Sequence, residues 1–372
     1  MNNKDLTTFV FIGGRQDRIN QGKDFPKEFY YGYFNFLEKY NNVELFELNK
    51  PNRSKVIIII DKILFKVFKL PFGLANVLSS RSYQQFKKSS NLVLVNEHVF
   101  FSTLLLIGLL KIFKKINVTV FLMGMFQSFQ AGNIFQKILI KLSFFIVNRF
   151  IFLGEGEFNY AKSLYEKNKS KFSFIPFCVD EKFWDIPDEF NTLNREYILF
   201  VGNDLNRDYK HLEKIILSLK EYNFKIVSTR ISNYIEALPN VDVVKGSWHN
   251  KKLSDKELKE LYSKAIISII PLKDTIQPSG QSVALQSMSC KTPVLISETI
   301  GFWDKENFID NKNIFFFKNN SAEDSVLKIR ELLSNQDILF NVSSNAFKTV
   351  REKYTLKNFS DKLEQIVNFK VI

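Results

Sequence analysis

The chain has 372 residues, of which 45% are hydrophobic, and a formal net charge of +13. This length exceeds one ordinary hydrophobic core, so about two domains are expected. Its 2 cysteines provide no disulfide framework, which fits a reducing compartment. The apolar run within residues 1–14 is too short for a secretory signal and fits a first strand. We therefore expect a cytoplasmic protein.

The positive charge is concentrated in residues 51–150, which hold 14 basic and 2 acidic residues. Lysines interrupt aliphatic and aromatic stretches there, and none of these stretches reaches the ~18 apolar residues of a membrane-spanning helix. Such segments bind peripherally to anionic membrane surfaces; the alternative is half-buried core helices with solvated lysines. We expect no nucleic-acid partner, because zinc-finger, RNA-recognition and helix-turn-helix patterns are missing from the sequence.

The first half alternates between predicted strands and helices. Strands are expected at 7–14, 42–49, 91–97, 117–124 and 150–155, and helices near 27–40, 100–114 and 134–148. Segment 54–60 fits either a strand or the start of a buried helix. The alternation predicts a doubly wound parallel sheet, whose ligands bind at the carboxyl ends of the strands. The residues expected at this edge are Gly13, Gly14, Arg15, Asn96, Glu97 and His98.

A polar segment without periodicity, 185–196, is the predicted linker. Beyond it the pattern restarts with a strand, a turn and a helix within 196–220. Strands at 224–230 and 241–246, a helix at 254–265 and helices from 321 to the end complete a second parallel sheet. We predict domains at 1–185 and 186–345, and a helix at 346–372 that packs back toward the first domain.

Residues 266–297 form a predicted strand–loop–helix–strand unit. Ser279, Gly280 and Gln281 stand where its helix begins. The first N–H groups of a helix have no intrahelical partner and carry partial positive charge, so this position is a candidate phosphate site. The alternative is an ordinary crossover with nothing bound.

Several motifs in the second half stand in a characteristic order. They are FIPFCVDEKFW, ILFVGND followed by Arg207 and Lys210, IIPLKD, SGQSVALQSMSCKTPVL and the tail FKTVREKYTLKNFSDKLEQIV. In this order and spacing, residues 170–370 resemble the family-4-type retaining glycosyltransferases of the GT-B fold. The resemblance implies two Rossmann-like domains facing a cleft and a nucleotide-sugar donor. Because no Asp-x-Asp motif occurs in the sequence, we expect no bound divalent metal and no other cofactor.

The resemblance also implies roles for individual residues. Arg207 and Lys210 would neutralise the donor diphosphate, Gly202 would allow a tight turn beneath it, and Gly246, beside Ser247, would flank the nucleotide base. On the acceptor side, His98 matches a histidine near the reacting carbon. Glu97 is a weaker alternative as a general base.

The chain departs from the family pattern at three positions. Of two glutamates usually found eight residues apart, the second is Gln286, whose amide can still bind a diol, and the first is Pro278, which cannot. Asn203 stands where the family usually has arginine, and Arg207 is the residue that would compensate.

The resulting expectation is a retaining, metal-independent hexosyltransferase of polysaccharide biosynthesis. It would transfer a sugar to a cell-surface glycan or lipid-linked acceptor at the inner face of the cell membrane. Two alternatives remain: a GT-B-like carbohydrate- or partner-binding protein without turnover, which Pro278 favours, and a nucleotide-sugar epimerase, for which the sequence offers few carboxylates and histidines. The sequence leaves open the nucleotide, the sugar, the acceptor and the oligomeric state.

Overall fold

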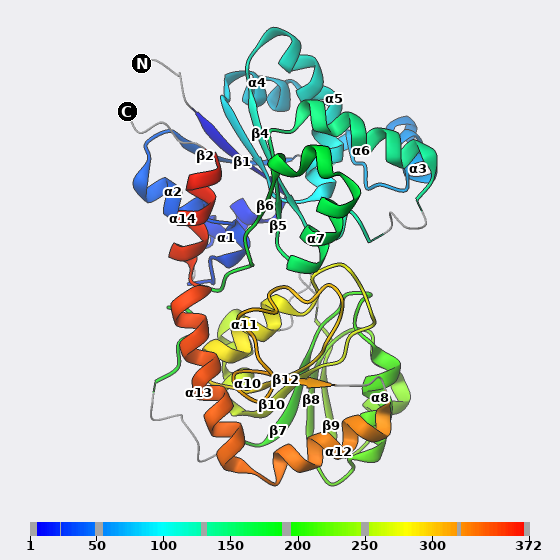
Figure 1. The fold of residues 1–372 in the computed structure, drawn as a ribbon, viewed down its shortest axis with the longest axis vertical. Coiled ribbons are helices and arrows are strands. Elements are labelled where there is room, and N and C mark those ends of the chain that lie inside the picture. The colour runs from blue at the N-terminus through cyan, green and yellow to red at the C-terminus, as the bar shows by residue number, and fades with distance from the viewer. Residues whose placement is uncertain are drawn as a thin grey trace. The chain divides into compact units, whose positions relative to one another are not determined.

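The computed structural model describes residues 6–22, 24–48, 55–127, 132–187, 195–246, 253–317 and 321–367. The chain divides into two compact units (Figure 1). Unit 1 comprises residues 1–176 and 359–372, and unit 2 comprises residues 177–358. The predicted boundary lay at 185/186, and the contacts divide the chain between Pro176 and Phe177.

Unit 1 is built on a six-stranded parallel sheet with the order β2-β1-β3-β4-β5-β6. The strands are β1 (Thr7–Ile12), β2 (Val43–Leu48), β3 (Asn91–Leu94), β4 (Asn117–Leu122), β5 (Arg149–Phe152) and β6 (Phe172–Phe174). The chain moves from β1 to β2 on one side and then returns to β3 on the other. The strand order therefore reverses between β1 and β3, where ligands of such sheets bind.

Helices surround this sheet. They are α1 (Arg15–Asn20), α2 (Tyr33–Lys39), α3 (Lys55–Phe68), α4 (Ser80–Lys88), α5 (Glu97–Phe113), α6 (Ile134–Ile146) and α7 (Glu155–Leu164), with short 3₁₀ turns at Glu28–Tyr30, Leu74–Asn76 and Glu166–Lys171. Of segment 54–60, which fitted either a strand or a helix, the described residues 55–60 belong to α3, a helix with no fully buried residue. Helices α1, α4 and α7 were not predicted.

The last helix, α14 (Leu356–Val367), packs on unit 1 through its residues from Phe359 onward. The Phe359 ring stacks on that of Phe121, with centroids 5.8 Å apart. Lys39 forms an ion pair with Glu364 at 2.6 Å. Helix α14 therefore belongs to the packing of the first unit.

Unit 2 repeats the architecture with the strand order β12-β11-β10-β7-β8-β9, all parallel. The strands are β7 (Tyr197–Val201), β8 (Phe224–Val227), β9 (Val241–Val244), β10 (Ala265–Ile270), β11 (Val294–Ser297) and β12 (Phe315–Phe317). The reversal lies between β7 and β10. The predicted fold class, two doubly wound parallel sheets, is confirmed.

The helices of unit 2 are α8 (Tyr209–Ser218), α9 (Asn233–Glu236), α10 (Asp255–Lys264), α11 (Gln281–Ser289), α12 (Ala322–Leu333) and α13 (Gln336–Lys353). Helix α10 begins with a reciprocal capping box between Ser254 and Glu257. Helix α11 is almost wholly buried, because it lies between the sheet and α13 and α10. Within the described residues, no helix combines the length and apolarity needed to cross a bilayer.

Candidate functional site

The strand reversal in unit 2 brings two turns together, one after β7 and one after β10. Asp208 donates its backbone N–H to the Pro271 carbonyl at 2.9 Å, and Lys273 donates to the Asn206 carbonyl at the same distance. A backbone bridge also joins Arg207 to Leu272. These bonds fix the turn at 202–208 against the segment that leads into α11, at the position where doubly wound sheets bind ligands.

Arg207 occupies the centre of this junction. Its side chain is only 3% exposed and lies against two glycines. A Cβ added to Gly202 would come within 2.5 Å of the Arg207 Nε, and a Cβ added to Gly280 would lie 3.6 Å from Nη1. The two glycines therefore leave the space that the guanidinium fills, and they place it at the beginning of α11.

The guanidinium is poorly satisfied by its surroundings. Among the described residues, neither Nε nor Nη1 of Arg207 has a hydrogen-bond acceptor. The Asp204 carboxylate lies 3.2 Å from Nη1, within ion-pair distance, but without hydrogen-bond geometry, and it is half exposed. A buried cation with unmade hydrogen bonds is costly. The arrangement favours an anionic ligand that would accept those bonds.

The N-terminus of α11 adds backbone donors at the same place. Gly280 precedes the helix with φ 80° and ψ −12°, and no side chain caps the helix. The first intrahelical hydrogen bond of α11 runs from the Ala284 N–H to the Gly280 carbonyl. The N–H groups of residues 281–283 therefore have no acceptor within the helix. The Gln281 Oε1 is buried without a described partner. Helix and guanidinium together form a candidate phosphate site.

Asn206 holds the two turns together, a role that the sequence analysis missed. Its Nδ2 donates to Gln277 Oε1 at 3.0 Å and to Ser279 Oγ at 2.8 Å. The second turn is supported from behind by Gly301, which donates its N–H to the Thr275 carbonyl at 2.7 Å. An asparagine in a turn is common in any fold, so the sequence carried no signal for this bridge.

Asn203 connects the same edge to the two outer strands. Its Oδ1 accepts from the Thr229 N–H at 2.7 Å, after β8, and its Nδ2 donates to the Gly246 carbonyl at 2.8 Å, after β9. The Arg230 guanidinium, a second cation that the sequence analysis missed, donates to the Asn203 carbonyl at 2.7 Å. Asn203 thus braces three strand ends. Ser247 lies outside the described residues.

Two predicted donor-side residues do not join this cluster. Lys210 is exposed in the first turn of α8, whose N-terminus is capped by Asp208. Gln286 is 5% exposed, and its Oε1 accepts from the hydroxyl of buried Tyr262 at 3.2 Å. In this conformation the Gln286 carbonyl serves the core of unit 2 rather than an open site.

In unit 1, the glycine turn after β1 is satisfied internally. Gly14, with φ 105°, is the N-cap of α1 and directly follows Gly13. The Glu47 carboxylate, at the end of β2, accepts the backbone N–H groups of Arg15 and Gln16, the latter at 2.9 Å. A carboxylate therefore already occupies the N-terminus of α1.

Glu97 and His98 begin α5, capped by Asn96, whose Oδ1 accepts the Val99 N–H at 2.8 Å. The His98 ring lies against the segment after α3, where a Cβ added to Gly73 would come within 2.7 Å of Nε2. Burial lowers the pKa of His98, and a hydrogen bond with the Phe72 backbone and the charge of Asp61 offset part of that change. The imidazole is therefore neutral at pH 7.

Glu157, in α7, is a buried carboxyl group that the sequence analysis missed. Its Oε1 accepts the Phe126 N–H at 3.0 Å. Burial, assisted by the negative charge of Glu97, raises the pKa of Glu157 to about 8. Burial also raises the pKa of Glu97, whose carboxylate accepts the Met123 N–H. The two carboxyl groups hold the turn after β4 and share an unfavourable charge interaction.

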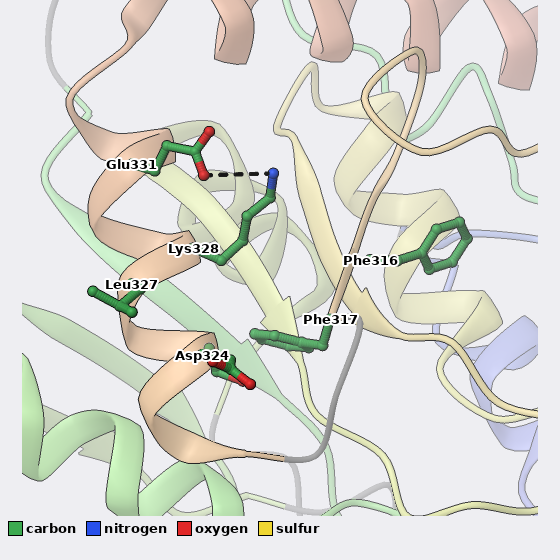
Figure 2. A pocket seen from close by; sticks show the side chains of 7 residues that line it. Phe316, Phe317, Asp324, Leu327, Lys328 and Glu331 are labelled. Carbon is green, nitrogen blue, oxygen red and sulfur yellow. Dashed lines mark ion pairs between the residues drawn. The ribbon is translucent and has the colours of Figure 1, made fainter.

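A hollow of about 560 Å³ lies elsewhere in unit 2, between β12 and α12. Figure 2 shows Phe316 and Phe317 on the strand side and Asp324, Lys328 and Glu331 on the helix. Lys328 and Glu331 form a 3.8 Å ion pair across one helical turn. No predicted site residue lines this hollow, so its position does not bear on the Arg207 cluster.

The second half of the chain matches a known protein family. Residues 184–349 match the family model of glycosyl transferases group 1, which confirms the resemblance to GT-B glycosyltransferases in the second half of the chain. A search of curated protein sequences finds no match.

Solved structures match nearly the whole chain. Sucrose-phosphate synthase from Thermosynechococcus elongatus is 14% identical with a TM-score of 0.68, covering 98% of each chain. A glycosyltransferase from Rickettsia africae is 13% identical with a TM-score of 0.61, again covering 98% of each chain. HepE of Anabaena in complex with UDP-glucose is 9% identical with a TM-score of 0.66, covering 97% of this chain and 99% of that one. At these identities the likeness establishes the fold.

Proposed function

We propose that this chain, whose residues 184–349 match the family model of glycosyl transferases group 1, is a retaining glycosyltransferase that uses a nucleotide-diphosphate sugar. The acceptor would be a cell-surface glycan or a lipid-linked precursor in polysaccharide biosynthesis. With a lipid-linked acceptor, the enzyme would work at the inner face of the cell membrane, bound peripherally.

The observation that supports this proposal is the buried Arg207 guanidinium beside the uncapped N-terminus of α11. When a glycosidic bond to a nucleotide diphosphate breaks, negative charge grows on the leaving phosphate. Preorganised cations and backbone N–H groups interact more strongly with this growing charge in the transition state than with the phosphate in the ground state. They therefore lower the barrier to bond breaking. Lys210, exposed near the same turn, would add a second cation when its flexible side chain reaches the diphosphate.

Two details follow for the reaction: which nucleotide to test first, and which group accepts the proton of the acceptor hydroxyl. HepE, which shares the fold, was solved with UDP-glucose, so a uridine nucleotide is the first candidate. The family resemblance suggests front-face attack, in which a donor phosphate oxygen accepts the proton of the acceptor hydroxyl. On this resemblance, the neutral imidazole of His98 would lie near the reacting carbon of the donor sugar. The reaction would require no metal ion.

The testing experiment measures binding of nucleoside diphosphates and their sugar derivatives by thermal shift, with and without EDTA. A ligand at a hundred times its dissociation constant should stabilise the protein by about 2.7 kcal/mol. We expect one diphosphate to stabilise the wild type regardless of EDTA and to fail on Arg207→Ala/Lys210→Ala.

The matched control is Lys214→Ala, which removes an exposed lysine one turn further along α8. It should bind the nucleotide as the wild type does. If no nucleotide stabilises the wild type, or if the double variant binds as well as the control, the proposed donor site is wrong.

A carbohydrate- or partner-binding protein without turnover is the second candidate. It is favoured by Pro278 in place of a glutamate and by Gln286, whose carbonyl accepts from Tyr262. Release of nucleoside diphosphate from a bound nucleotide sugar, even slowly into water, distinguishes the two. A binding protein should bind the sugar nucleotide and release none, whereas a retaining enzyme should yield product with the anomeric configuration of the donor.

A further inference from the structure

Helix α3 presents an apolar row to solvent instead of to the core. Val56, Ile59, Ile60 and Ile63 follow one another at the spacing of a single helical face, and all four are exposed. Helices at the surface of a globular domain normally turn such a row inward. In α3 the orientation is inverted, so its apolar face is available to a binding partner.

Helix α5 does the same in its second half. Leu105, Leu109 and Ile112 recur at helical spacing and are exposed, and Phe113 at the end of the helix is 86% exposed. The opposite face of α5 is buried against the sheet through Val99, Phe100 and other residues. A helix that is apolar all round, yet buried on one side only, leaves a second apolar face uncovered.

Helix α6 lies between these two and extends the surface. Ile138 and Leu142 are exposed one turn apart, and Phe145 is 83% exposed. Figure 1 shows α5 and α6 side by side in unit 1 with α3 next to α6, in agreement with the contacts of α6 with both helices. Lys111 of α5 donates to the Ile146 carbonyl of α6 at 2.7 Å.

The charges around these rows are almost all positive. Lys62 and Lys66 of α3 and Lys141 of α6 are exposed. The only acidic residues of the three helices are Asp61 and Glu97. Asp61 accepts the Leu74 N–H at 2.9 Å, and Glu97 accepts the Met123 N–H. Both carboxylates are thus engaged in unit 1, and the surface itself is apolar and basic.

We propose that this surface, the outward rows of α3, α5 and α6 with their lysines, binds an anionic phospholipid bilayer. The most exposed side chains, Phe113 and Phe145, would enter the boundary between headgroups and acyl chains, and the lysines would contact phosphate groups. A large exposed apolar patch marks an interaction site. A second copy of the chain is the weaker occupant, because a twofold contact would set like charges against each other.

This inference deepens the proposed function by naming the surface that would bring the enzyme to a lipid-linked acceptor. The binding itself is a property of unit 1 and needs no nucleotide. It is therefore measured separately from donor binding, and either proposal can fail while the other holds.

The experiment is flotation of the full-length protein with vesicles of phosphatidylcholine alone or mixed with phosphatidylglycerol. We expect binding to the mixed vesicles only, weakening as salt is added. Two variants test the two components. Phe113→Ser/Phe145→Ser removes the apolar insertion. Lys62→Glu/Lys66→Glu/Lys69→Glu reverses charge on α3 and at Lys69, the exposed residue directly after it. Each should reduce the bound fraction at least tenfold.

Matched controls carry the same chemistry on unit 2. Leu327→Ser/Phe340→Ser replaces two exposed apolar residues, and a triple Lys→Glu variant reverses exposed charges, at Lys220, Lys256 and Lys264. Both controls should float as the wild type does. All variants change exposed side chains, so each should retain the far-ultraviolet circular dichroism of the wild type.

Three outcomes would overturn the proposal. The first is a wild type that does not float with mixed vesicles, and the second is vesicle binding that both surface variants retain. The third is a wild-type dimer in solution that Phe113→Ser/Phe145→Ser dissociates, without any vesicle binding, which would assign the surface to self-association.

Discussion

Arg207 is predicted to destabilise the unliganded protein while it strengthens ligand binding, and Arg207→Met separates these effects. Methionine keeps much of the aliphatic stem beside Gly202 and Gly280 and removes the guanidinium. In the free protein the buried Nε and Nη1 lack acceptors among the described residues. Removing such unsatisfied buried donors should raise the free energy of unfolding by about 1–3 kcal/mol. The lost ion pair with half-exposed Asp204 offsets only about 0–1 kcal/mol of this.

We therefore expect the free energy of unfolding of the unliganded variant to exceed that of the wild type by about 1 kcal/mol. For a unit of this size, that corresponds to a rise in melting temperature of about 2–4 °C. Binding should change in the opposite direction. A hydrogen bond to a charged group contributes about 1.5–3 kcal/mol, so the dissociation constant for the nucleoside diphosphate should increase about tenfold to 150-fold.

Differential scanning calorimetry of the free protein and isothermal titration with the diphosphate measure the two quantities. The control is Arg330→Met, which removes a guanidinium from an exposed ion pair with Glu221 at 2.8 Å and should leave nucleotide binding unchanged. An Arg207→Met variant that is clearly less stable than the wild type, or that binds the diphosphate equally well, would refute the reasoning.

Three further predictions concern the support of the sites. Asn206→Ala removes two hydrogen bonds that join the turns and should weaken diphosphate binding in titration and lower unit 2 stability by about 1–3 kcal/mol; unchanged binding would show that the turns hold without it. Gly301→Ala places a Cβ 2.3 Å from the Ile276 carbonyl oxygen, so the melting temperature should fall and donor binding should weaken, and a variant of wild-type stability would contradict that geometry. The raised pKa of Glu157, about 8 against an ordinary 4.5, means that the folded state keeps a proton which the unfolded state releases. Stability should therefore fall as pH rises from about 4.5 through about 8, and melting curves of Glu157→Gln should show a smaller fall; an equal fall in both proteins would exclude this carboxyl as the cause.

Much of the candidate site followed from local sequence patterns. A glycine after a strand, a cation in the next turn and a Ser-Gly pair before a buried helix are short-range signals, because the backbone conformations and helix ends they mark are set by neighbouring residues. Gly280 could be named in this way, and the resemblance to a known family then singled out Gly202 and Arg207 among the residues of the first turn. The alternation of apolar strands with helices likewise determined the fold class.

The side-chain contacts that distinguish one site residue from another could not be named in this way. Asn203 was predicted as a donor-binding residue in the place of a family arginine, and its amide joins the ends of β8 and β9. Gln286 was expected at a diol, yet its carbonyl accepts from Tyr262. Both outcomes depend on which strands are neighbours in the sheet and on what α11 packs against, and pairs distant in the chain are invisible to a local pattern.

The sequence by itself determined two parallel α/β units and the basic, apolar character of residues 51–150, and it placed a helix start at Ser279–Gln281. Only the tertiary structure decided that Arg207 is enclosed with Nε and Nη1 lacking acceptors among the described residues, that Glu47 occupies the turn after β1, and that α3 turns its apolar row outward. Composition fixes how apolar a segment is, but the direction in which its side chains point depends on the elements packed against it. For α3, no described element covers the outward row, and that surface is where we expect the protein to meet a membrane.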